Sequence, residues 1–360
     1  MRFVRHKGMG ELPSPSGEPS LEALRVLLNL QGEDGERSFR LILAWLVQAL
    51  RSRGPYPVLV LLGERGSAKS TAARILRSLI DPSTVPLRTS PKTAHDVYID
   101  ATSSWTISLD NISSLPKWLS DILCMLSTGG GFSTRTLFTD REQELFEAMR
   151  PTILNGITDV VTADDLVQRS LIVRLPAIDK GSYKTEKQIQ RELRVLRPDI
   201  FTALLDAMSE GLRIVEEVEV PPLPRMADFV AWAIATESAL GGERGAFMEA
   251  YSVSDEEGAQ QALEASPLAE PLYELAAAAG PGGWQGTARE MLSKLRDFGD
   301  DDLQHSKEWP KAPNSLSHAL RRLAPLFREA GHVQVQQLSR SDAKGTKRWM
   351  VRLLKGGRES

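Results

Sequence analysis

The strongest chemical pattern in the chain lies in residues 58–76, VLVLLGERGSAKSTAARIL. Its centre, GERGSAKS, fits the G-x-x-x-x-G-K-[ST] spacing of a phosphate-binding loop, except that Ala68 replaces the second glycine. In such a loop backbone N–H groups point at phosphate oxygens, while a lysine reaches the β- and γ-phosphates and a hydroxyl binds Mg²⁺. We therefore predict that Lys69 and Ser70 bind ATP and Mg²⁺. The predicted nucleotide contacts are Gly63, Glu64, Arg65, Gly66, Ser67, Ala68, Lys69, Ser70 and Thr71.

The surroundings of this loop favour the same prediction over a chance glycine-rich turn. Residues 58–62 form a continuous apolar run of the kind expected for a buried parallel strand, and a helical pattern starts at Ser70. Ala68 is a small departure in this interpretation, because alanine can take the helical conformation where that helix begins.

An acidic residue that can share the Mg²⁺ ion follows another strand-like run, WTISL, at residues 105–109. Asp110 stands at the carboxyl end of that run, where an acid can hold the metal; the alternative is an aspartate that merely ends a strand. The next position usually carries a glutamate that polarises the attacking water, and here it is Asn111. An amide can orient water but cannot accept its proton, so Asp96 and Asp100 are the candidates for that role.

Two more polar residues have positions typical of ATPase function. Asn155 follows the apolar run TIL, where a sensor amide can hold the lytic water near the γ-phosphate; an ordinary Asn-Gly turn is the alternative. Arg169 precedes the run SLIVRL and can act as an arginine finger that reaches the γ-phosphate of a neighbouring subunit. A surface arginine without that role fits the sequence equally well.

A parallel sheet is needed to bring these residues together. Strand-like runs alternate with helical patterns in this part of the chain, which predicts a parallel sheet covered by helices on both faces. The predicted strands are residues 58–62, 97–101, 105–110, 151–157 and 170–175, and the predicted helices are 70–80, 115–126 and 163–168. Two further helices are predicted before the sheet, within residues 21–52.

Beyond Pro176 the pattern becomes helical. From residue 267 the order changes to three helices followed by two strand-like runs, 332–338 and 348–354, which flank a polar turn. Three helices and a β-hairpin are the order of a winged helix-turn-helix domain. The helices before that domain form a predicted lid and cover residues 185–196, 198–218, 225–240 and 243–250.

The charge of the chain is distributed unevenly. The net charge is −3, but residues 251–310 carry 4 Lys and Arg against 12 Asp and Glu, whereas residues 311–360 carry 11 against 3. Such a basic segment is a candidate DNA contact, with a solvated tail or a protein-binding winged helix as the alternatives. We predict a recognition helix at residues 315–328, with basic side chains outside its apolar stripe. The predicted DNA contacts on this helix and on the hairpin are Arg321, Arg322, Lys344, Lys347 and Arg348.

Composition sets broader limits. The chain has 360 residues, of which 41% are hydrophobic and 25% are charged, as in a globular protein of two or three domains. Its one cysteine, Cys124, excludes an internal disulfide framework and a cysteine-rich zinc site, and it fits a reducing cytosol. No apolar run approaches the roughly 20 residues that span a bilayer, and no secretory signal is evident. We therefore expect a cytoplasmic protein without a membrane partner.

A further segment, residues 128–151, lies between the predicted Mg²⁺ ligand and the predicted sensor. The alternation in STRTLFT and ELFEAMR, around TDRE, predicts a β-hairpin just before Asn155. The succession of TGGG, this hairpin, RPTILNG and QRSLIVRLP resembles the AAA+ core of superfamily 3 helicases. More closely, it resembles the helicase-like ATPases attached to primases of phages, plasmids and integrative elements. The resemblance covers about residues 35–240.

This resemblance implies a homo-hexameric ring that pulls on DNA, with the hairpin entering the central pore. Arg135 and Arg141 on the hairpin would then contact single-stranded DNA. Arg225, at the start of a lid helix, resembles the position of a second sensor that touches the phosphates. The partner protein that the resemblance implies is a primase or a polymerase.

Together these observations predict an α/β protein that acts as an ATP-dependent hexameric DNA helicase or translocase in mobile-element DNA replication. Duplex DNA is expected at the winged helix. One alternative is an ATP-switched DNA-binding or loading ATPase without unwinding activity, which Asn111 favours. The other is a P-loop kinase of small molecules, against which the long C-terminal domain argues. The predicted parts are a lead-in at residues 1–34, a P-loop AAA+ core at 35–180, a helical lid at 181–265 and a winged-helix domain at 266–360.

Overall fold

The computed structural model divides into two compact units, which we describe separately. Unit 1 consists of Met1–Val160 and Arg169–Ser254, and unit 2 consists of Val161–Gln168 and Asp255–Ser360. Arg141 and Lys344, two of the predicted DNA contacts, lie outside the described residues, as does the side chain of Arg135. The described residues are 6–15, 18–135, 143–156, 160–179, 181–220, 225–306, 308–338 and 347–354.

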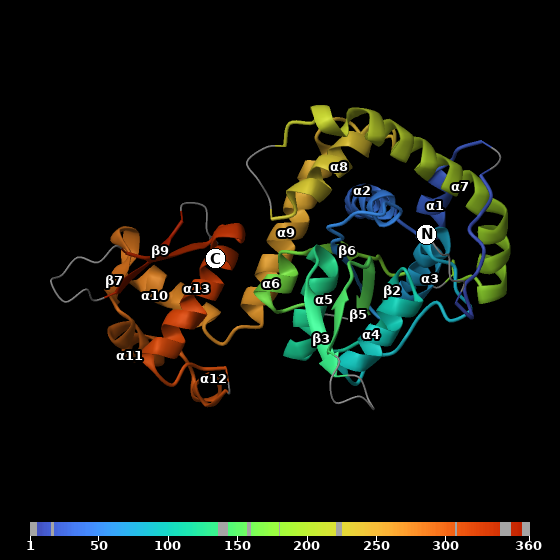
Figure 1. The fold of residues 1–360 in the computed structure, drawn as a ribbon. Coiled ribbons are helices and arrows are strands. Elements are labelled where there is room, and N and C mark those ends of the chain that lie inside the picture. Colours follow the sequence, from blue (N-terminus) through green and yellow to red (C-terminus); the bar gives the residue numbers. More distant parts are fainter. Residues whose placement is uncertain are drawn as a thin grey trace. The chain divides into compact units, whose positions relative to one another are not determined.

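A four-stranded parallel sheet forms the centre of unit 1 (Figure 1). Its strands, in the spatial order β2-β5-β1-β6, are β1 (Val58–Leu62), β2 (Ile107–Ile112), β5 (Thr152–Gly156) and β6 (Ser170–Arg174). The predicted α/β class with a parallel sheet is therefore confirmed. Leu59 and Leu61 of the central strand face one hydrophobic core, while Val58 and Val60 are buried on the opposite face. Burial on both faces explains the continuous apolar run of this strand.

Helices pack against the sheet along its length. Helix α3 (Lys69–Ile80) contacts β1, β2 and β5, and α2 (Gly32–Ala49) contacts β6 and α3. Helix α5 (Lys117–Thr128) packs on β5, and α4 (Ala94–Ser103) packs on α5. Helix α3 follows the candidate phosphate loop directly, so its packing on three strands fixes the position of that loop.

A second set of helices surrounds α2. Figure 1 shows α7 (Glu186–Ile214) and α8 (Ala227–Glu237) arching over α2, and both helices pack against it. Helix α1 (Glu22–Leu27) packs on α7, whose end continues into the short 3₁₀ helix Val215–Glu217. Helix α9 (Ala246–Glu264) begins in unit 1 and ends in unit 2.

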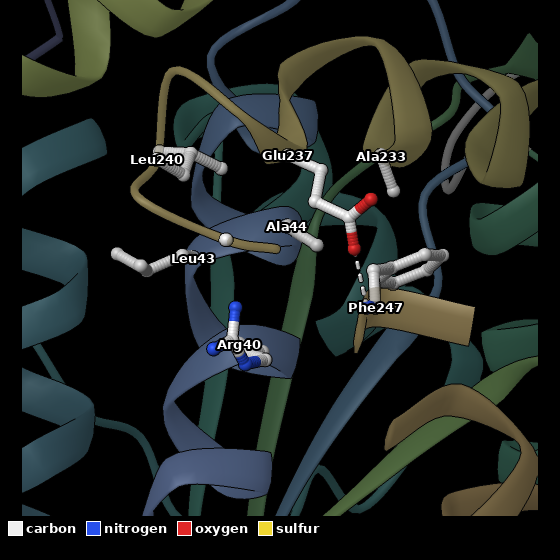
Figure 2. Close-up of a pocket in the computed structure, with 8 residues that line it drawn as sticks. Arg40, Leu43, Ala44, Ala233, Glu237, Leu240 and Phe247 are labelled. Atoms are coloured by element: carbon white, nitrogen blue, oxygen red, sulfur yellow. Dashed lines mark hydrogen bonds between the residues drawn. The ribbon is translucent and has the colours of Figure 1, made fainter. Parts of the chain in front are cut away.

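The start of α9 is held by Glu237, the last residue of α8 (Figure 2). The buried Glu237 carboxylate accepts hydrogen bonds from the N–H groups of Gly245, at 2.9 Å, and Phe247, at 2.5 Å. The adjoining cavity, which Arg40 also lines, measures about 20 Å³. That volume holds about one water molecule, so this cavity is part of the packing and is too small for a nucleotide.

One predicted strand of unit 1 is wrong. Residues 97–101 belong to α4, which begins with a capping box between Thr93 and Asp96. Val97 and Ala101, four residues apart, are buried on the same face of this helix. The cap and this spacing outweigh the strand preference of a short apolar run.

Two predicted helices prove to be one. Helix α7 continues through Pro198, where the sequence pattern indicated a break. A proline inside a helix costs about 3 kcal/mol, because it removes a backbone hydrogen bond and crowds the preceding turn. Ile200, Leu204 and Ala207 on this helix are buried in the core of unit 1, and their packing offsets that cost.

The hairpin predicted before Asn155 is confirmed. Strands β3 (Gly131–Arg135) and β4 (Gln143–Glu147) pair antiparallel, with Phe132 opposite Phe146. The connecting residues 136–142 lie outside the described part of the chain.

Unit 2 combines helices with a three-stranded antiparallel sheet in the order β7-β9-β8. Its strands are β7 (Trp284–Thr287), β8 (Val333–Gln337) and β9 (Arg348–Leu353). Strand β7 was not predicted, because GPGGWQGT reads as a turn and the strand exists only through its pairing with β9. The helices are α6 (Asp164–Val167), α10 (Ala269–Ala278), the 3₁₀ helix Gly280–Gly282, α11 (Ala288–Phe298), α12 (Asp301–His305) and α13 (Pro313–Glu329).

No membrane-crossing helix was found in the described ranges. Each helix there is too short or too polar to span a bilayer. This agrees with the absence of a long apolar run in the sequence.

Candidate functional site

The carboxyl ends of the parallel strands meet at one edge of the sheet in unit 1. Strand β1 ends at Leu62 and leads into the loop of residues 63–68, while Asp110 and Asn111 stand near the end of β2 and Asn155 near the end of β5. Ligand sites of open parallel sheets form at this edge, because the loops that leave the strands gather there. Residues far apart in the sequence are therefore neighbours here.

The loop of residues 63–68 is tightly folded. A side chain at Gly63 would come within 2.5 Å of the Ser67 Oγ and 2.6 Å of the Leu175 carbonyl oxygen, so only glycine fits. Gly66 has a φ of +94°, a conformation that glycine adopts without strain. The buried Ser67 closes the turn by donating its Oγ–H to the Glu64 carbonyl at 2.9 Å. The two glycines predicted from the motif are thus required by the shape of the loop.

The predicted conformation of Ala68 is wrong. Its φ of 56° and ψ of 30° are left-handed, not helical, and helix α3 begins one residue later, at Lys69. A left-handed conformation costs an L-residue other than glycine roughly 1–2 kcal/mol, because its Cβ approaches the following carbonyl. The chain needs this reversal to enter α3 from the loop, which explains why glycine is usual at this motif position.

Lys69 stands at the start of α3 and turns back over the loop. Its Nζ donates hydrogen bonds to the carbonyl oxygens of Gly63, at 2.7 Å, and Glu64, at 2.9 Å. Partial burial lowers the pKa of Lys69, and the negative charge of Asp110 opposes this shift. The ammonium group therefore lies against the loop carbonyl oxygens, and its charge interacts with that of Asp110. Glu64 and Arg65 are exposed at the tip of the loop.

Asp110 joins the loop to the neighbouring strands. Its Oδ1 accepts a hydrogen bond from the Ser70 Oγ at 2.7 Å and another from the Asn155 Nδ2 at 2.6 Å. Asn155 is only 1% exposed, and its own Oδ1 accepts the Asn111 backbone N–H at 2.7 Å. The structure thus brings together Ser70, Asp110, Asn111 and Asn155, which come from three different segments of the chain.

The backbone around Asn111 departs from a regular strand. The pairing of β2 with β5 shifts register between Leu109 and Ile112, as in a β-bulge, and Asn111 has a φ of 55°. Asparagine tolerates this left-handed region better than most residues, whereas a glutamate would be strained there. This gives a physical reason for the asparagine where the motif usually carries an acid. Asn155 holds the bulge in place, because it bonds both Asp110 and Asn111.

The two other candidate proton acceptors form hydrogen bonds or an ion pair with residues in or beside α4. Asp96 accepts hydrogen bonds from the backbone N–H groups of Thr93 and Lys92, and the bonds from Thr93 lower the pKa of Asp96. Asp100 forms an ion pair with Arg88. Burial raises the pKa of Asp100, and the charge of Arg88 opposes this shift. Neither carboxylate takes part in the Ser70–Asp110–Asn155 network.

Arg169 lies at the opposite edge of the sheet. Its carbonyl oxygen accepts the Val58 N–H at 2.8 Å, so it stands beside the first residue of β1. A five-residue strand spans about 16 Å, which separates Arg169 from the Ser70–Asp110 contact of its own chain. Arg225 is exposed immediately before α8.

In unit 2, α13 has one buried and one basic face. Its apolar stripe, which includes Leu316 and Leu320, is buried as predicted, while Arg321 and Arg322 are exposed. On β9 the exposed positions include Arg348 and Arg352, with Lys347 exposed just before the strand. Arg352 was not among the predicted DNA contacts, and the alternation of side chains along β9 puts it on the same face as Arg348.

A search of curated proteins found no match. Among solved structures, an A-form apo structure of the NrS-1 C-terminal region shares 12% identity and a TM-score of 0.40, covering 94% of this chain and 77% of that chain. An apo structure of the NrS-1 C-terminal region (305–718) shares 11% identity and a TM-score of 0.39, covering 95% and 77%. Scores this low carry no argument about fold or function.

Two protein-family models match the sequence. The family described as actinomycete integrative conjugative element replication protein matches residues 23–257, which is more than half of the chain. The C-terminal domain of the same family, the AICE RepA C-terminal domain, matches residues 268–357. The two matches follow each other along nearly the whole sequence. This chain therefore belongs to the family of actinomycete integrative conjugative element replication proteins.

Proposed function

We propose that unit 1 is a P-loop ATPase core of the AAA+ type and that the protein is an ATP-driven DNA helicase or translocase in the replication of its element. One observation carries this proposal: the Ser70 hydroxyl meets the Asp110 carboxylate at 2.7 Å, beside Lys69, at the carboxyl edge of a parallel sheet. A phosphate loop and a metal-binding acid stand together in this way in P-loop ATPases. Membership of a replication-protein family supports a role in DNA replication.

The residues present fit ATP and Mg²⁺. The Ser70 hydroxyl and the Asp110 carboxylate are oxygen ligands of the kind Mg²⁺ prefers, and Lys69 and the loop N–H groups would hold the phosphates. The described residues contain no cluster of three His, Cys, Asp or Glu side chains able to hold a metal. A site with few protein ligands suits Mg²⁺, which keeps several waters and binds together with substrate phosphates. Bound Mg²⁺ would neutralise charge on the phosphates.

The position of Arg169 supports a ring assembly as part of this proposal. This residue lies at the amino edge of the sheet, away from the phosphate loop of its own chain, so as an arginine finger it would act on a nucleotide bound to a neighbouring subunit. The resemblance to superfamily 3 helicases suggests six subunits, with the β3–β4 hairpin in the pore. Arg135 and Arg141 would be the pore contacts to single-stranded DNA.

The proposal is tested on the wild-type protein with three measurements. We expect its mass in solution to increase to that of a hexamer with a non-hydrolysable ATP analogue and forked DNA. We also expect DNA to stimulate phosphate release, and ATP to drive strand displacement on the fork. ATP-dependent assembly and DNA binding without strand displacement would favour the alternative, a loading ATPase, to which Asn111 points. Absence of ATP binding would refute both versions.

For unit 2 we propose a winged-helix DNA-binding domain in which α13 is the recognition helix. From α10 to β9 the chain forms a helix, the short strand β7, helix α11, the five-residue helix α12, helix α13 and a hairpin, and this order supports the fold. Arg321 and Arg322 on α13 and Arg348 on β9 are exposed, as phosphate contacts require. Duplex DNA is the expected ligand.

Replacing both Arg321 and Arg322 with alanine should weaken duplex binding and reduce its salt dependence. Each neutralised phosphate releases counterions, so the slope of log K against log salt should become shallower by about 2 if both residues meet phosphate. The measurement is fluorescence anisotropy across a salt series. Arg191→Ala with Arg194→Ala, both exposed on α7, makes the same charge change and should leave the slope unaltered. Equal slopes for wild type and the α13 variant would remove α13 from the DNA interface.

A further inference from the structure

Tyr183 lies against the loop of residues 63–68 without belonging to the phosphate-loop motif. A Cβ added at Gly66 would stand 3.1 Å from the Tyr183 hydroxyl oxygen, so this hydroxyl lies next to the loop backbone. The Tyr183 side chain is 57% exposed. The absence of a side chain at Gly66 therefore serves two purposes: it permits the left-handed backbone, and it leaves room for this hydroxyl.

The segment that carries Tyr183 is anchored at the start of α7. Thr185 and Gln188 form a capping box there: the Thr185 N–H donates to Gln188 Oε1 at 2.8 Å, and the Gln188 N–H donates to Thr185 Oγ1 at 3.3 Å. Glu186 forms an ion pair with Arg74 of α3 at 3.8 Å. The capped start of α7, two residues after Tyr183, thus lies against the same helix that begins at Lys69, which fixes the backbone near Tyr183 relative to the loop.

The hydroxyl of Tyr183 is available as a donor. Within the described residues it makes no hydrogen bond, and it lies beside the proposed phosphate loop, whose N–H groups would bind phosphate oxygens. A phenol O–H is a neutral donor that can bond a phosphate oxygen, and bonds to charged acceptors are stronger than bonds between neutral groups. Single exposed tyrosines are common on protein surfaces, but the hydroxyl of Tyr183 lies beside the proposed phosphate loop, where it could contact a ligand.

We propose that the Tyr183 hydroxyl donates a hydrogen bond to the phosphate chain of the bound nucleotide, and that the segment of residues 181–185 forms one wall of the nucleotide site. This inference rests on the ATP-binding role proposed above. It adds a ligand-binding residue from the strand-to-helix connection after β6, outside the segments that the sequence motifs mark. Tyr183 would strengthen nucleotide binding without adding charge to the site, because its hydroxyl is neutral.

The test compares Tyr183→Phe with wild type in nucleotide binding. Removing the hydroxyl should weaken binding of the non-hydrolysable ATP analogue about tenfold, as expected for the loss of one hydrogen bond to a charged acceptor. Calorimetric titration gives the dissociation constants, and repeating it with ADP separates contacts to the terminal phosphate from contacts to the inner ones. Tyr273→Phe, the same chemical change on α10 of unit 2, is the matched control and should bind as wild type does.

The outcomes separate this inference from the proposed function. If wild type binds nucleotide and Tyr183→Phe binds equally well, the inference is overturned while the ATP-binding role stands. If only Tyr183→Ala weakens binding, the ring matters through packing, and the proposed hydroxyl contact is likewise overturned. If wild type binds no nucleotide, the proposed function is refuted, and this inference is refuted as well because it depends on that function. Weaker binding by Tyr183→Phe, with an unchanged thermal unfolding midpoint, supports the hydroxyl contact.

Discussion

Replacing Lys69 with alanine should lower ATP hydrolysis by about 10²–10³-fold or more, the range expected when one electrostatic stabiliser of a transition state is removed. The Lys69 ammonium lies over the loop, bonded to the carbonyl oxygens of Gly63 and Glu64, and no other lysine of the motif can take its place. Phosphate release under saturating ATP, together with nucleotide binding, measures the effect.

The fold should survive the Lys69→Ala change, because Lys69 is only partly buried and both of its acceptor carbonyls lie in a partly exposed loop. An unaltered unfolding curve would establish this. Lys117→Ala is the matched control, since Lys117 is exposed at the start of α5 and has no part in the candidate site. Turnover equal to wild type in the Lys69 variant would remove the loop from the chemistry and leave the ATPase proposal without its main residue.

Replacing Asp81 with alanine should destabilise unit 1 by about 3–5 kcal/mol, because it leaves a buried arginine without its counter-charge. Arg77 is 1% exposed, and its guanidinium reaches Asp81 Oδ2 at 3.1 Å. Burial lowers the pKa of Arg77, and the charge of Asp81 opposes this shift. The same Asp81 oxygen accepts the Thr106 N–H at 2.9 Å, so the change also deprives a backbone donor of its acceptor.

This ion pair connects the fold to the candidate site. Arg77 and Asp81 stand at the end of α3, and Thr106 directly precedes β2. The other ends of these two elements carry Ser70 and Asp110, which meet at 2.7 Å. We therefore expect that loss of the pair loosens the alignment of α3 with β2 as well as lowering stability.

Denaturant unfolding measures the Asp81 effect. Asp81→Asn should cost less than Asp81→Ala, because the amide oxygen can still accept the Thr106 N–H. Asp34→Ala is the control: it breaks an exposed pair with Arg37 and should barely move the midpoint. Equal midpoints for Asp81→Ala and Asp34→Ala would mean that the buried pair contributes no more than a surface one.

The local sequence was sufficient to identify the elements of the candidate site. An apolar run followed by glycines, a lysine and a hydroxyl predicts a strand, a loop and a helix, since each feature depends on neighbouring residues only. Asp110 and Asn155 were predicted for the same reason, because each stands near the end of an apolar strand. Parallel pairing then requires such ends to meet at one edge, and the structure confirms the parallel sheet.

Local patterns were misleading where a cap or a core decided the outcome. Residues 97–101 have the apolar character of a short strand, yet a capping box at Thr93 begins a helix there. Pro198 has the local signature of a helix break, yet buried residues beyond it keep α7 continuous. Strand β7 has no strand signature of its own and forms because β9 offers it hydrogen bonds.

Only the tertiary structure decided how the site residues are held. The β-bulge at Asn111 depends on the register of β2 against β5, and the Asn155 side chain that supports it comes from a strand more than 40 residues away. The left-handed Ala68, the buried Arg77–Asp81 pair and the approach of Tyr183 to Gly66 are likewise contacts or conformations imposed by the packed fold. Residue type and spacing specify strands, loops and helix starts, because those depend on short-range sterics and burial. Distances between separate segments depend on the packing of the whole unit, which no local pattern contains.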